Sequence, residues 1–237
     1  MRAEIICVGT ELLMGQIVNT NAQFFAKELS ELGIDSHFQT TVGDNEKRIH
    51  EVLKLALKRS DIIITSGGLG PTADDLTHES IASFFNAKPV LDEKVLKELE
   101  KKFFSRGYKK MPPMNKKQAY KPKDAKWIPN KNGTARGIIW EHRAASCDLR
   151  PAKRSNSALS SQLSARKIVL TFPGVPSELY SMWEETVKPY LKKNICKDVI
   201  FSRTLKFTGI GESALAERIE PLFDLKNPTV APYASLG

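Results

Sequence analysis

Apolar and polar positions alternate along the first 90 residues as strands and helices alternate in an α/β fold. An apolar run at 4–8 predicts a strand, and apolar residues then recur at the spacing of an amphipathic helix that begins near 19–21: Ala22, Phe25, Ala26 and Leu29. The unit repeats as a strand at 37–42, a helix with its apolar face at 49–56, a strand at 62–65 and a helix from about 75 to 85. Repeats of this length predict a mostly parallel sheet covered by helices on both faces.

The loops that follow these strands are where a ligand site is expected. Gly9-Thr10-Glu11, Gly43-Asp44-Asn45 and residues 66–75 each come directly after a predicted strand. Ligands of open α/β sheets bind outside the carboxyl ends of the strands, which meet at one edge of the sheet. We therefore expect the three loops to form one site.

The loop after the third strand has the residue types of a phosphate-binding turn. Gly67, Gly68 and Gly70 fall within four positions, and a helical pattern follows them. Glycines let backbone amides approach an anion, and a helix N-terminus adds partial positive charge. Asp74 and Asp75 would repel a phosphate unless a cation lay between them. The segment therefore indicates a metal-assisted nucleotide site.

The strand and helix pattern continues in the second half of the chain. A helix is predicted at 92–106, and a loop at 132–137 precedes the apolar residues 138–140. A strand at 167–172 leads through Pro176 and Glu178 into a helix whose apolar face consists of Leu179, Met182, Trp183 and Val187.

Two segments depart from this pattern. Residues 142–166 hold six serines and five alanines with almost no large apolar side chains, so we expect a disordered or poorly packed insertion there. The tail, with a strand expected at 199–207 and a helix through Leu222, has the pattern of the start of a second small α/β unit that breaks off.

Composition narrows the class of protein. The 237 residues are 41% hydrophobic, and no run approaches the ~18 apolar residues that span a membrane, so no membrane partner is expected. Cys7, Cys147 and Cys196 are widely spaced, and the N-terminus has the pattern of a strand rather than of a signal peptide. These features favour reduced cysteines and a cytoplasmic location.

The net charge of +9 is spread over several segments. Residues 142–166 hold five basic residues against one acidic residue, and lysine clusters between 101 and 126 supply most of the remainder. Such charges usually form a solvated face and less often steer an anionic ligand. No nucleic-acid-binding motif accompanies them, so nucleic acid is not an expected partner.

Several ordered motifs together resemble the CinA family, whose main domain is that of the molybdopterin-binding proteins MogA, MoaB, MoeA and gephyrin. The likeness covers almost the whole chain except 142–166. The matching motifs are Gly9-Thr10-Glu11-Leu12-Leu13 with residues 15–21, the segment 38–45, Gly67-Gly68-Leu69-Gly70-Pro71-Thr72 with Asp74-Asp75-Leu76-Thr77, Pro173-Gly174-Val175-Pro176-Ser177-Glu178, residues 207–213 and residues 227–233.

The resemblance implies a three-layer α/β/α sandwich that hydrolyses the pyrophosphate bond of ADP-ribose to AMP and ribose 5-phosphate. A divalent metal ion (Mg, Mn or Co) and potassium are the implied cofactors, and a homodimer is the implied assembly. Residues 1–195 would form this domain. Residues 196–237 would be the truncated start of a KH-like linking domain, without the nicotinamide mononucleotide deamidase domain that follows in relatives.

The resemblance and the loop chemistry together suggest roles for individual residues. Asp75 and Asp44 are the expected catalytic and metal-binding residues, with Glu11 as a third metal ligand. The expected nucleotide-binding and phosphate-binding residues are Thr10, Asn19, Ser66, Gly67, Gly68, Gly70, Pro71, Thr72, Thr134, Gly174 and Glu178.

Structural explanations compete with these roles at several positions. Asp75 or Asp74 can cap the helix that follows, Asp44 suits a turn, and Asn19 suits a helix N-cap. Arg136 stands where relatives carry a proline, which is expected to alter its loop.

Two other functions remain open at this point. One is binding or adenylylation of a pterin in molybdenum cofactor biosynthesis, since that reaction places a similar diphosphate over the same loop. The other is a non-catalytic interaction module linked to competence or DNA damage, which only the basic charge supports.

Overall fold

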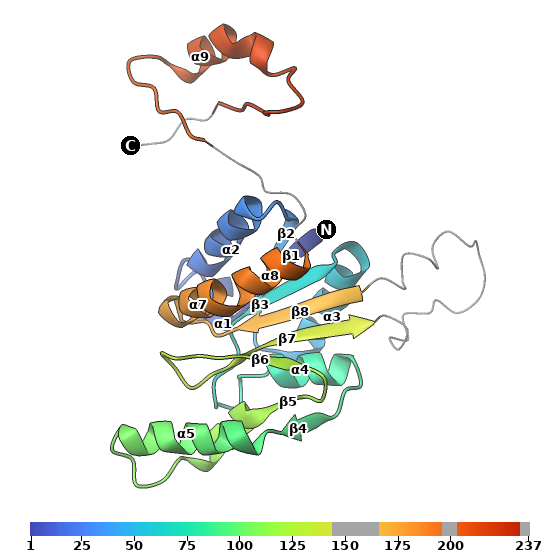
Figure 1. Ribbon diagram of the computed structural model, residues 1–237, viewed down its shortest axis with the longest axis vertical. Helices are drawn as coiled ribbons and strands as arrows, with labels where there is room; N and C mark the ends of the chain where they lie inside the picture. The colour runs from blue at the N-terminus through green and yellow to red at the C-terminus, as the bar shows by residue number, and fades with distance from the viewer. Residues whose placement is uncertain (144–165, 196–202, 233–237) are drawn as a thin grey trace, which may run out of the picture. The chain divides into compact units, whose positions relative to one another are not determined.

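The computed structural model describes residues 1–143, 166–195 and 203–232, which belong to two compact units divided between 200 and 201. The first unit is built on a six-stranded sheet in the order β2-β1-β3-β8-β7-β6 (Figure 1). Its strands are β1 (Arg2–Val8), β2 (Asp35–Val42), β3 (Ile62–Ser66), β6 (Lys126–Ile128), β7 (Gly137–Arg143) and β8 (Arg166–Phe172). The first four in spatial order are parallel to one another. Strand β7 pairs antiparallel with β8, and β6 pairs antiparallel with β7.

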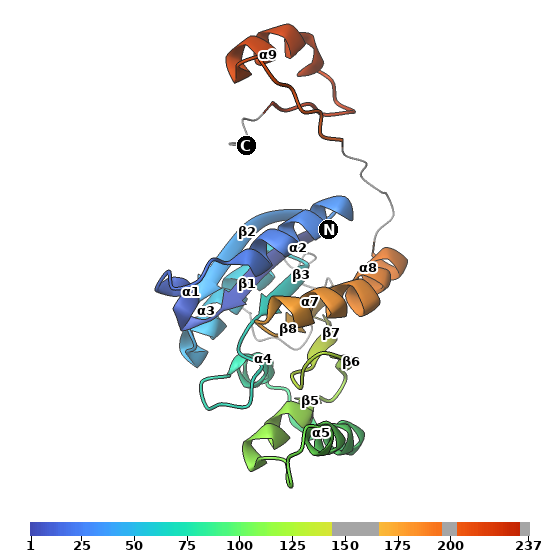
Figure 2. The same cartoon turned by 90° about the vertical axis from the view of Figure 1, so that its left-hand side faces the viewer.

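Helices cover both faces of the sheet, which confirms the three-layer α/β/α sandwich (Figure 2). One face packs against α2 (Thr20–Glu31) and against α7 (Pro176–Met182), which continues through the π-helical turn η3 (Trp183–Val187) into α8 (Lys188–Asn194). The other face packs against α3 (Glu46–Arg59) and α4 (Thr77–Phe84). Side chains of successive strand residues enter opposite layers, because the strand period is two.

A smaller layer lies beside the main sheet between α4 and β7. It contains β4 (Pro89–Leu91), α5 (Glu93–Ser105), the 3-10 helix η1 (Pro113–Ala119) and β5 (Tyr120–Pro122). A separate core of Val95, Leu99, Phe103, Met111 and Ala119 holds α5 against η1. The helix predicted at 92–106 is confirmed, whereas the three-residue strands β4, β5 and β6 are too short to leave a period-two pattern in the sequence.

Three elements differ from those expected from the sequence. Residues expected as a loop form the short helix α1 (Thr10–Leu13), and α4 begins two residues later than expected. In the second unit, α9 (Glu212–Ile219) and the 3-10 turn η4 (Glu220–Leu222) are helical as expected. The strand expected at 199–207 is wrong over 203–207, which form no strand. In the part of the second unit that the structure describes, no strand lies beside them to share hydrogen bonds.

The expected insertion falls on the connection between β7 and β8. The two strands pair antiparallel out to Arg143 and Arg166. Residues 144–165 lie outside the described residues, as do 199–202 of the expected tail strand.

A buried ion pair links β1 to the end of α3. Glu4 is 0% exposed, and Arg59 donates to its two carboxylate oxygens at 2.9 and 2.7 Å.

We expect Arg59→Ala to lower the free energy of unfolding by about 2 kcal/mol, because it leaves the Glu4 charge buried without its cation. Partial exposure of Arg59 keeps the loss below the usual range for such pairs. Urea unfolding measures the effect. The matched control is Lys58→Ala on the exposed side of the same helix, and an equal loss there would contradict the prediction.

Candidate functional site

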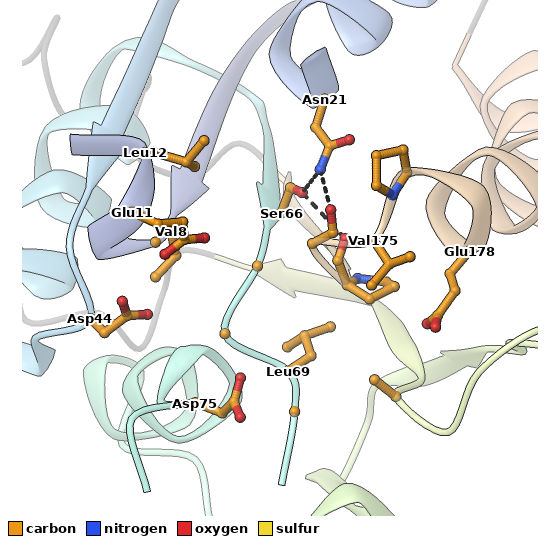
Figure 3. Close-up of a pocket in the computed structure, with 18 of the residues that line it drawn as sticks. Val8, Glu11, Leu12, Asn21, Asp44, Ser66, Leu69, Asp75, Val175 and Glu178 are labelled. Atoms are coloured by element: carbon orange, nitrogen blue, oxygen red, sulfur yellow. Dashed lines mark hydrogen bonds between the residues drawn. The ribbon is translucent and has the colours of Figure 1, made fainter. Parts of the chain in front are cut away.

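One pocket of about 730 Å³ lies at the carboxyl ends of the parallel strands, as the loop pattern predicted (Figure 3). Its volume is within the range of small-molecule sites. Of the expected site residues, all but Thr10 and Thr72 line it: Glu11, Asn19, Asp44, Ser66, Gly67, Gly68, Gly70, Pro71, Asp75, Thr134, Gly174 and Glu178. The three loops after β1, β2 and β3 therefore meet in one place.

The glycine turn after β3 requires its first two glycines. Gly67 and Gly68 have φ values of 101° and 65°, and a Cβ at Gly67 would collide with the carbonyl oxygen of Val8. The start of the turn is fixed at both backbone groups of Gly67. Its N–H donates to Phe172 O at 3.0 Å, and its carbonyl oxygen accepts from Thr77 Oγ1 at 2.8 Å. The backbone can thus pass close to β1 and still open onto the pocket.

The amides that remain for an anion differ from the expected set. Gly67 N–H is used by β8, whereas the N–H groups of Gly68, Leu69 and Gly70 have no acceptor among the described residues. Ser66 is buried, and its hydroxyl accepts from Asn21 at 2.9 Å and donates to Pro173 O at 3.3 Å. The candidate anion site therefore consists of the three amides at 68–70.

Each of the two key aspartates holds a threonine. Asp44 Oδ2 accepts from the N–H and the hydroxyl of Thr10, both at 2.9 Å. Asp75 Oδ2 accepts from the N–H and the hydroxyl of Thr72, at 2.9 and 2.5 Å. The hydroxyls of Thr10 and Thr72 are thereby occupied, and neither threonine lines the pocket as expected.

The two carboxylates are anchored at one oxygen only. No described residue donates a hydrogen bond to Oδ1 of Asp44 or of Asp75, so these oxygens are available to a ligand or a cation. The competing explanation that Asp75 or Asp74 caps α4 is wrong, since the N-cap is Leu76 and no side chain caps the helix. For Asp44 a structural role is real, because it caps the N-terminal end of α1 through Thr10.

The acidic residues lie close to one another beside the glycine turn. Glu11 and Asp44 lie near the ends of β1 and β2, and Asp75 lies on the side of α4 (Figure 3). Carboxylate oxygens are the ligands that Mg²⁺ and Mn²⁺ prefer. Within the described ranges, however, no three His, Cys, Asp or Glu side chains are close enough together to hold a metal ion. A cation here would need further oxygen ligands from its nucleotide.

Part of the pocket lining is apolar, and sequence reasoning assigned these side chains no role. Leu12, Ile17, Val18 and Val175 form this part together with Pro173 and Pro176. Val18 is 82% exposed and Val175 is 50% exposed, an unusual state for side chains of this kind. Ile17 and Val18 belong to the matching motif at 15–21, but they lie in a loop without strand or helix periodicity, so nothing assigned them to the pocket wall.

Two asparagines join the elements around the pocket. Asn19 caps α2 by accepting from Ala22 N–H at 3.1 Å, as its structural explanation predicted. Asn21 donates to Ser66 Oγ at 2.9 Å and to Gly174 O at 2.8 Å, which ties the end of β3 to the loop before α7 (Figure 3).

The wall that contains Thr134 is held by a buried network that local sequence patterns could not reveal. Asn130 donates to Ala135 O at 2.7 Å and to Glu178 Oε2 at 2.6 Å. Lys102 donates to Asn130 O and to Gly133 O, at 2.6 and 2.7 Å. Burial, followed by the nearby charges of Arg136 and Arg106, lowers the pKa of Lys102. Glu178 thus positions the wall of the pocket.

Arg136, which departs from the family pattern, has a partner of its own. Its guanidinium forms an ion pair with Glu98 of α5. The loop before β7 is therefore attached to α5, and Thr134 and Ala135 still line the pocket.

Lys117 of η1 supports the glycine turn from the side away from the pocket. Its ammonium group donates to Thr72 O at 2.8 Å and to Asp75 O at 2.6 Å, and it pairs with Glu79 at 3.3 Å. Enclosure of the ring, followed by the charge of Lys117, lowers the pKa of His78 to about 4, so this histidine is neutral at pH 7. The contacts cross more than 40 residues, and no sequence motif marks them.

Comparisons with known proteins agree with the fold. Residues 4–193 match the family described as "Probable molybdopterin binding domain", and residues 202–237 match "Damage-inducible protein CinA KH domain". The solved structure of the protein CinA from Thermoplasma acidophilum, described as of unknown function, is 32% identical with a TM-score of 0.64. The match covers 79% of this chain and 96% of that one.

Two curated relatives match the whole chain. They are CinA-like proteins of Microcystis aeruginosa and Rippkaea orientalis, 53% and 50% identical over 238 residues. The matches cover 100% of this chain and 52% of each relative, so the chain spans about half the length of the curated relatives it matches. Among the described helices, none is long and apolar enough to cross a membrane.

Proposed function

We propose that this chain, which belongs to the CinA family, is a metal-dependent hydrolase that cleaves the pyrophosphate bond of ADP-ribose. Water adds across the P–O–P linkage, and the products are AMP and ribose 5-phosphate. One observation carries the proposal: the free amides of Gly68, Leu69 and Gly70 share one pocket with the carboxylates of Asp44 and Asp75 and with several apolar side chains.

The free amides and the apolar side chains of the pocket suit the two chemical parts of a nucleotide. The amides at 68–70 would hold phosphate oxygens, and the apolar side chains Leu12, Val18 and Val175 would enclose a base. Negative charge on Glu11, Asp44 and Asp75 opposes a diphosphate unless a cation neutralises it. Asp44 and Asp75 each have one free carboxylate oxygen for a divalent ion, with Glu11 nearby. Magnesium in nucleotide sites typically takes one or two carboxylates and completes its shell with phosphate oxygens and water.

When bound, a divalent ion (Mg, Mn or Co) would supply charge stabilisation on the phosphate oxygens, with potassium as the additional cation implied by the resemblance. The protein's own contribution is positioning. The Thr10 and Thr72 contacts keep Asp44 and Asp75 in place, and Lys117 holds the backbone that carries Asp75. Preorganised groups of this kind stabilise developing charge without moving during the reaction.

The direct test is incubation of the chain with ADP-ribose and Mg²⁺ or Mn²⁺, with AMP and ribose 5-phosphate measured by chromatography. The proposal predicts equal amounts of the two products. Absence of AMP above a heat-denatured control with Mg²⁺, with Mn²⁺ and with Co²⁺ would reject it.

Metal removal gives a separate prediction. With excess EDTA we expect the affinity of the chain for ADP, measured by calorimetry, to fall at least about tenfold, because like charges on Asp44 and Asp75 then repel the diphosphate. The double variant Asp44→Asn/Asp75→Asn removes that repulsion, so its ADP affinity should depend much less on the metal. Equal metal dependence in both proteins would contradict the assignment of these two carboxylates.

The description of the matching family favours a second candidate, a pterin-binding or pterin-adenylylating protein of molybdenum cofactor biosynthesis. A pterin would pack on the apolar side chains of the pocket in place of adenine. Tight binding of molybdopterin without any hydrolysis of ADP-ribose would favour this candidate over the first.

A further inference from the structure

The positive charge of the chain is concentrated in one structural layer. Residues 86–136 contain 15 Lys and Arg residues against 5 Asp and Glu residues, a net charge of +10, whereas the whole chain carries +9. The rest of the chain is therefore close to neutral. Most of this segment is the small layer of β4, α5, η1 and β5, which appears as a separate group beside the main sheet in Figure 1, and its last part contains β6 and the loop before β7.

Exposed aromatic and apolar side chains lie within the most basic part of this layer. Phe104 at the end of α5 is 56% exposed, Tyr108 after it is 52% exposed, and Met114 of η1 is 55% exposed. The basic residues among them are also exposed: Lys101, Arg106, Lys109, Lys110 and Lys116. None of these five forms an ion pair with a described residue. We call the side chains named in this paragraph the basic–aromatic surface.

The basic–aromatic surface is held in shape by the core beneath it. Tyr108 N–H donates to Phe103 O at 3.1 Å. The Tyr108 ring packs edge-to-face on the buried Phe103 ring, with 5.4 Å between the ring centroids. Phe103 in turn packs in the core that joins α5 to η1. A preformed surface loses little conformational entropy when a ligand binds to it.

We propose that the basic–aromatic surface binds single-stranded nucleic acid without sequence preference. Lysine and arginine side chains neutralise a phosphate backbone, and exposed rings stack on bases that a single strand leaves accessible. A basic face that served only solubility would not need two exposed rings between its charges. None of these side chains lines the nucleotide pocket, so the proposal does not depend on the proposed hydrolysis.

The test is fluorescence anisotropy of a labelled 20-nucleotide oligothymidylate and of a duplex of equal length, titrated with the chain between 50 and 200 mM salt. We expect the single strand to bind more tightly than the duplex and its affinity to fall linearly on logarithmic axes as salt rises. Phe104→Ser/Tyr108→Ser should weaken single-strand binding at least about tenfold with little effect on the duplex.

Charge reversal separates this surface from net charge in general. Lys109→Glu/Lys110→Glu should reduce the salt dependence of single-strand binding by about 1.4 in logarithmic slope, since two phosphate contacts are lost. The control Lys192→Glu/Lys193→Glu changes the net charge equally on exposed positions of α8 and should leave binding unchanged. The charge-reversal variants should retain the thermal midpoint of the parent chain, and Phe104→Ser/Tyr108→Ser should lower it because the Tyr108–Phe103 ring contact is lost. All variants should retain the ADP-ribose hydrolysis of the parent chain.

Three results would overturn the proposal. The first is no binding of the oligonucleotide at 50 mM salt. The second is equal loss of binding in the two charge-reversal variants, which would indicate attraction by net charge alone. The third is tighter binding to vesicles of anionic lipid than to the single strand, together with no effect of Phe104→Ser/Tyr108→Ser on single-strand binding. That result would assign the surface to a membrane instead.

Discussion

Replacing Asp75 with asparagine is expected to lower the rate constant of ADP-ribose hydrolysis by on the order of 10²–10³-fold while leaving the fold intact. The amide oxygen of asparagine can still accept both hydrogen bonds from Thr72, so the loop keeps its shape. What is lost is the negative charge at the free oxygen, which the proposal assigns to the metal ion. Steady-state kinetics with AMP detection, together with the thermal midpoint, measures both properties.

Two controls define what the Asp75 result means. Asp124→Asn removes one carboxylate from an exposed turn outside the pocket and should leave the rate unchanged. Asp75→Ala also releases Thr72 and should therefore lower both the rate and the stability. A rate within threefold of the parent chain in Asp75→Asn would remove Asp75 from the catalytic machinery.

The second large effect is expected at the glycine turn. Gly67→Ala should lower the free energy of unfolding by about 3 kcal/mol or more, because the new Cβ meets the backbone carbonyl of Val8 at a φ that non-glycine residues rarely adopt. It should also abolish ADP binding, since the displaced turn carries the amides of 68–70.

Gly107→Ala is the matched control for Gly67→Ala. Gly107 also has a positive φ, 86°, but an added Cβ there meets nothing within 4 Å. Its cost should be only about 1 kcal/mol, and it should leave ADP binding intact. Urea unfolding and calorimetry separate the two effects, and equal losses in both variants would contradict the role of the Val8 contact.

The elements that carry the site could be predicted because each leaves a local pattern. The apolar stripe of α2, the cap at Asn19 and the glycines after β3 are all visible within a few neighbouring residues. The convergence of three loops followed from the general geometry of parallel sheets, which brings strand ends together whatever their sequence.

The supporting contacts could not be predicted in the same way. Lys117 reaches Asp75 O across 42 residues, and Asn130 reaches Glu178 across 48 residues. Such pairings depend on how the layers pack, and neither residue type nor spacing marks them in the sequence. The same limit explains Ser66, which was assigned to phosphate but whose hydroxyl bonds to Asn21 and Pro173.

The most direct test of the central claim is a crystal structure of the Asp75→Asn variant, soaked with ADP-ribose and Mn²⁺ and with the metal located by anomalous scattering. The account predicts diphosphate oxygens within hydrogen-bond distance of the amides of Gly68, Leu69 and Gly70, and manganese bound on the side of Asp44 and Glu11. A nucleotide bound elsewhere, with no anion at the turn and no manganese near these carboxylates, would contradict it.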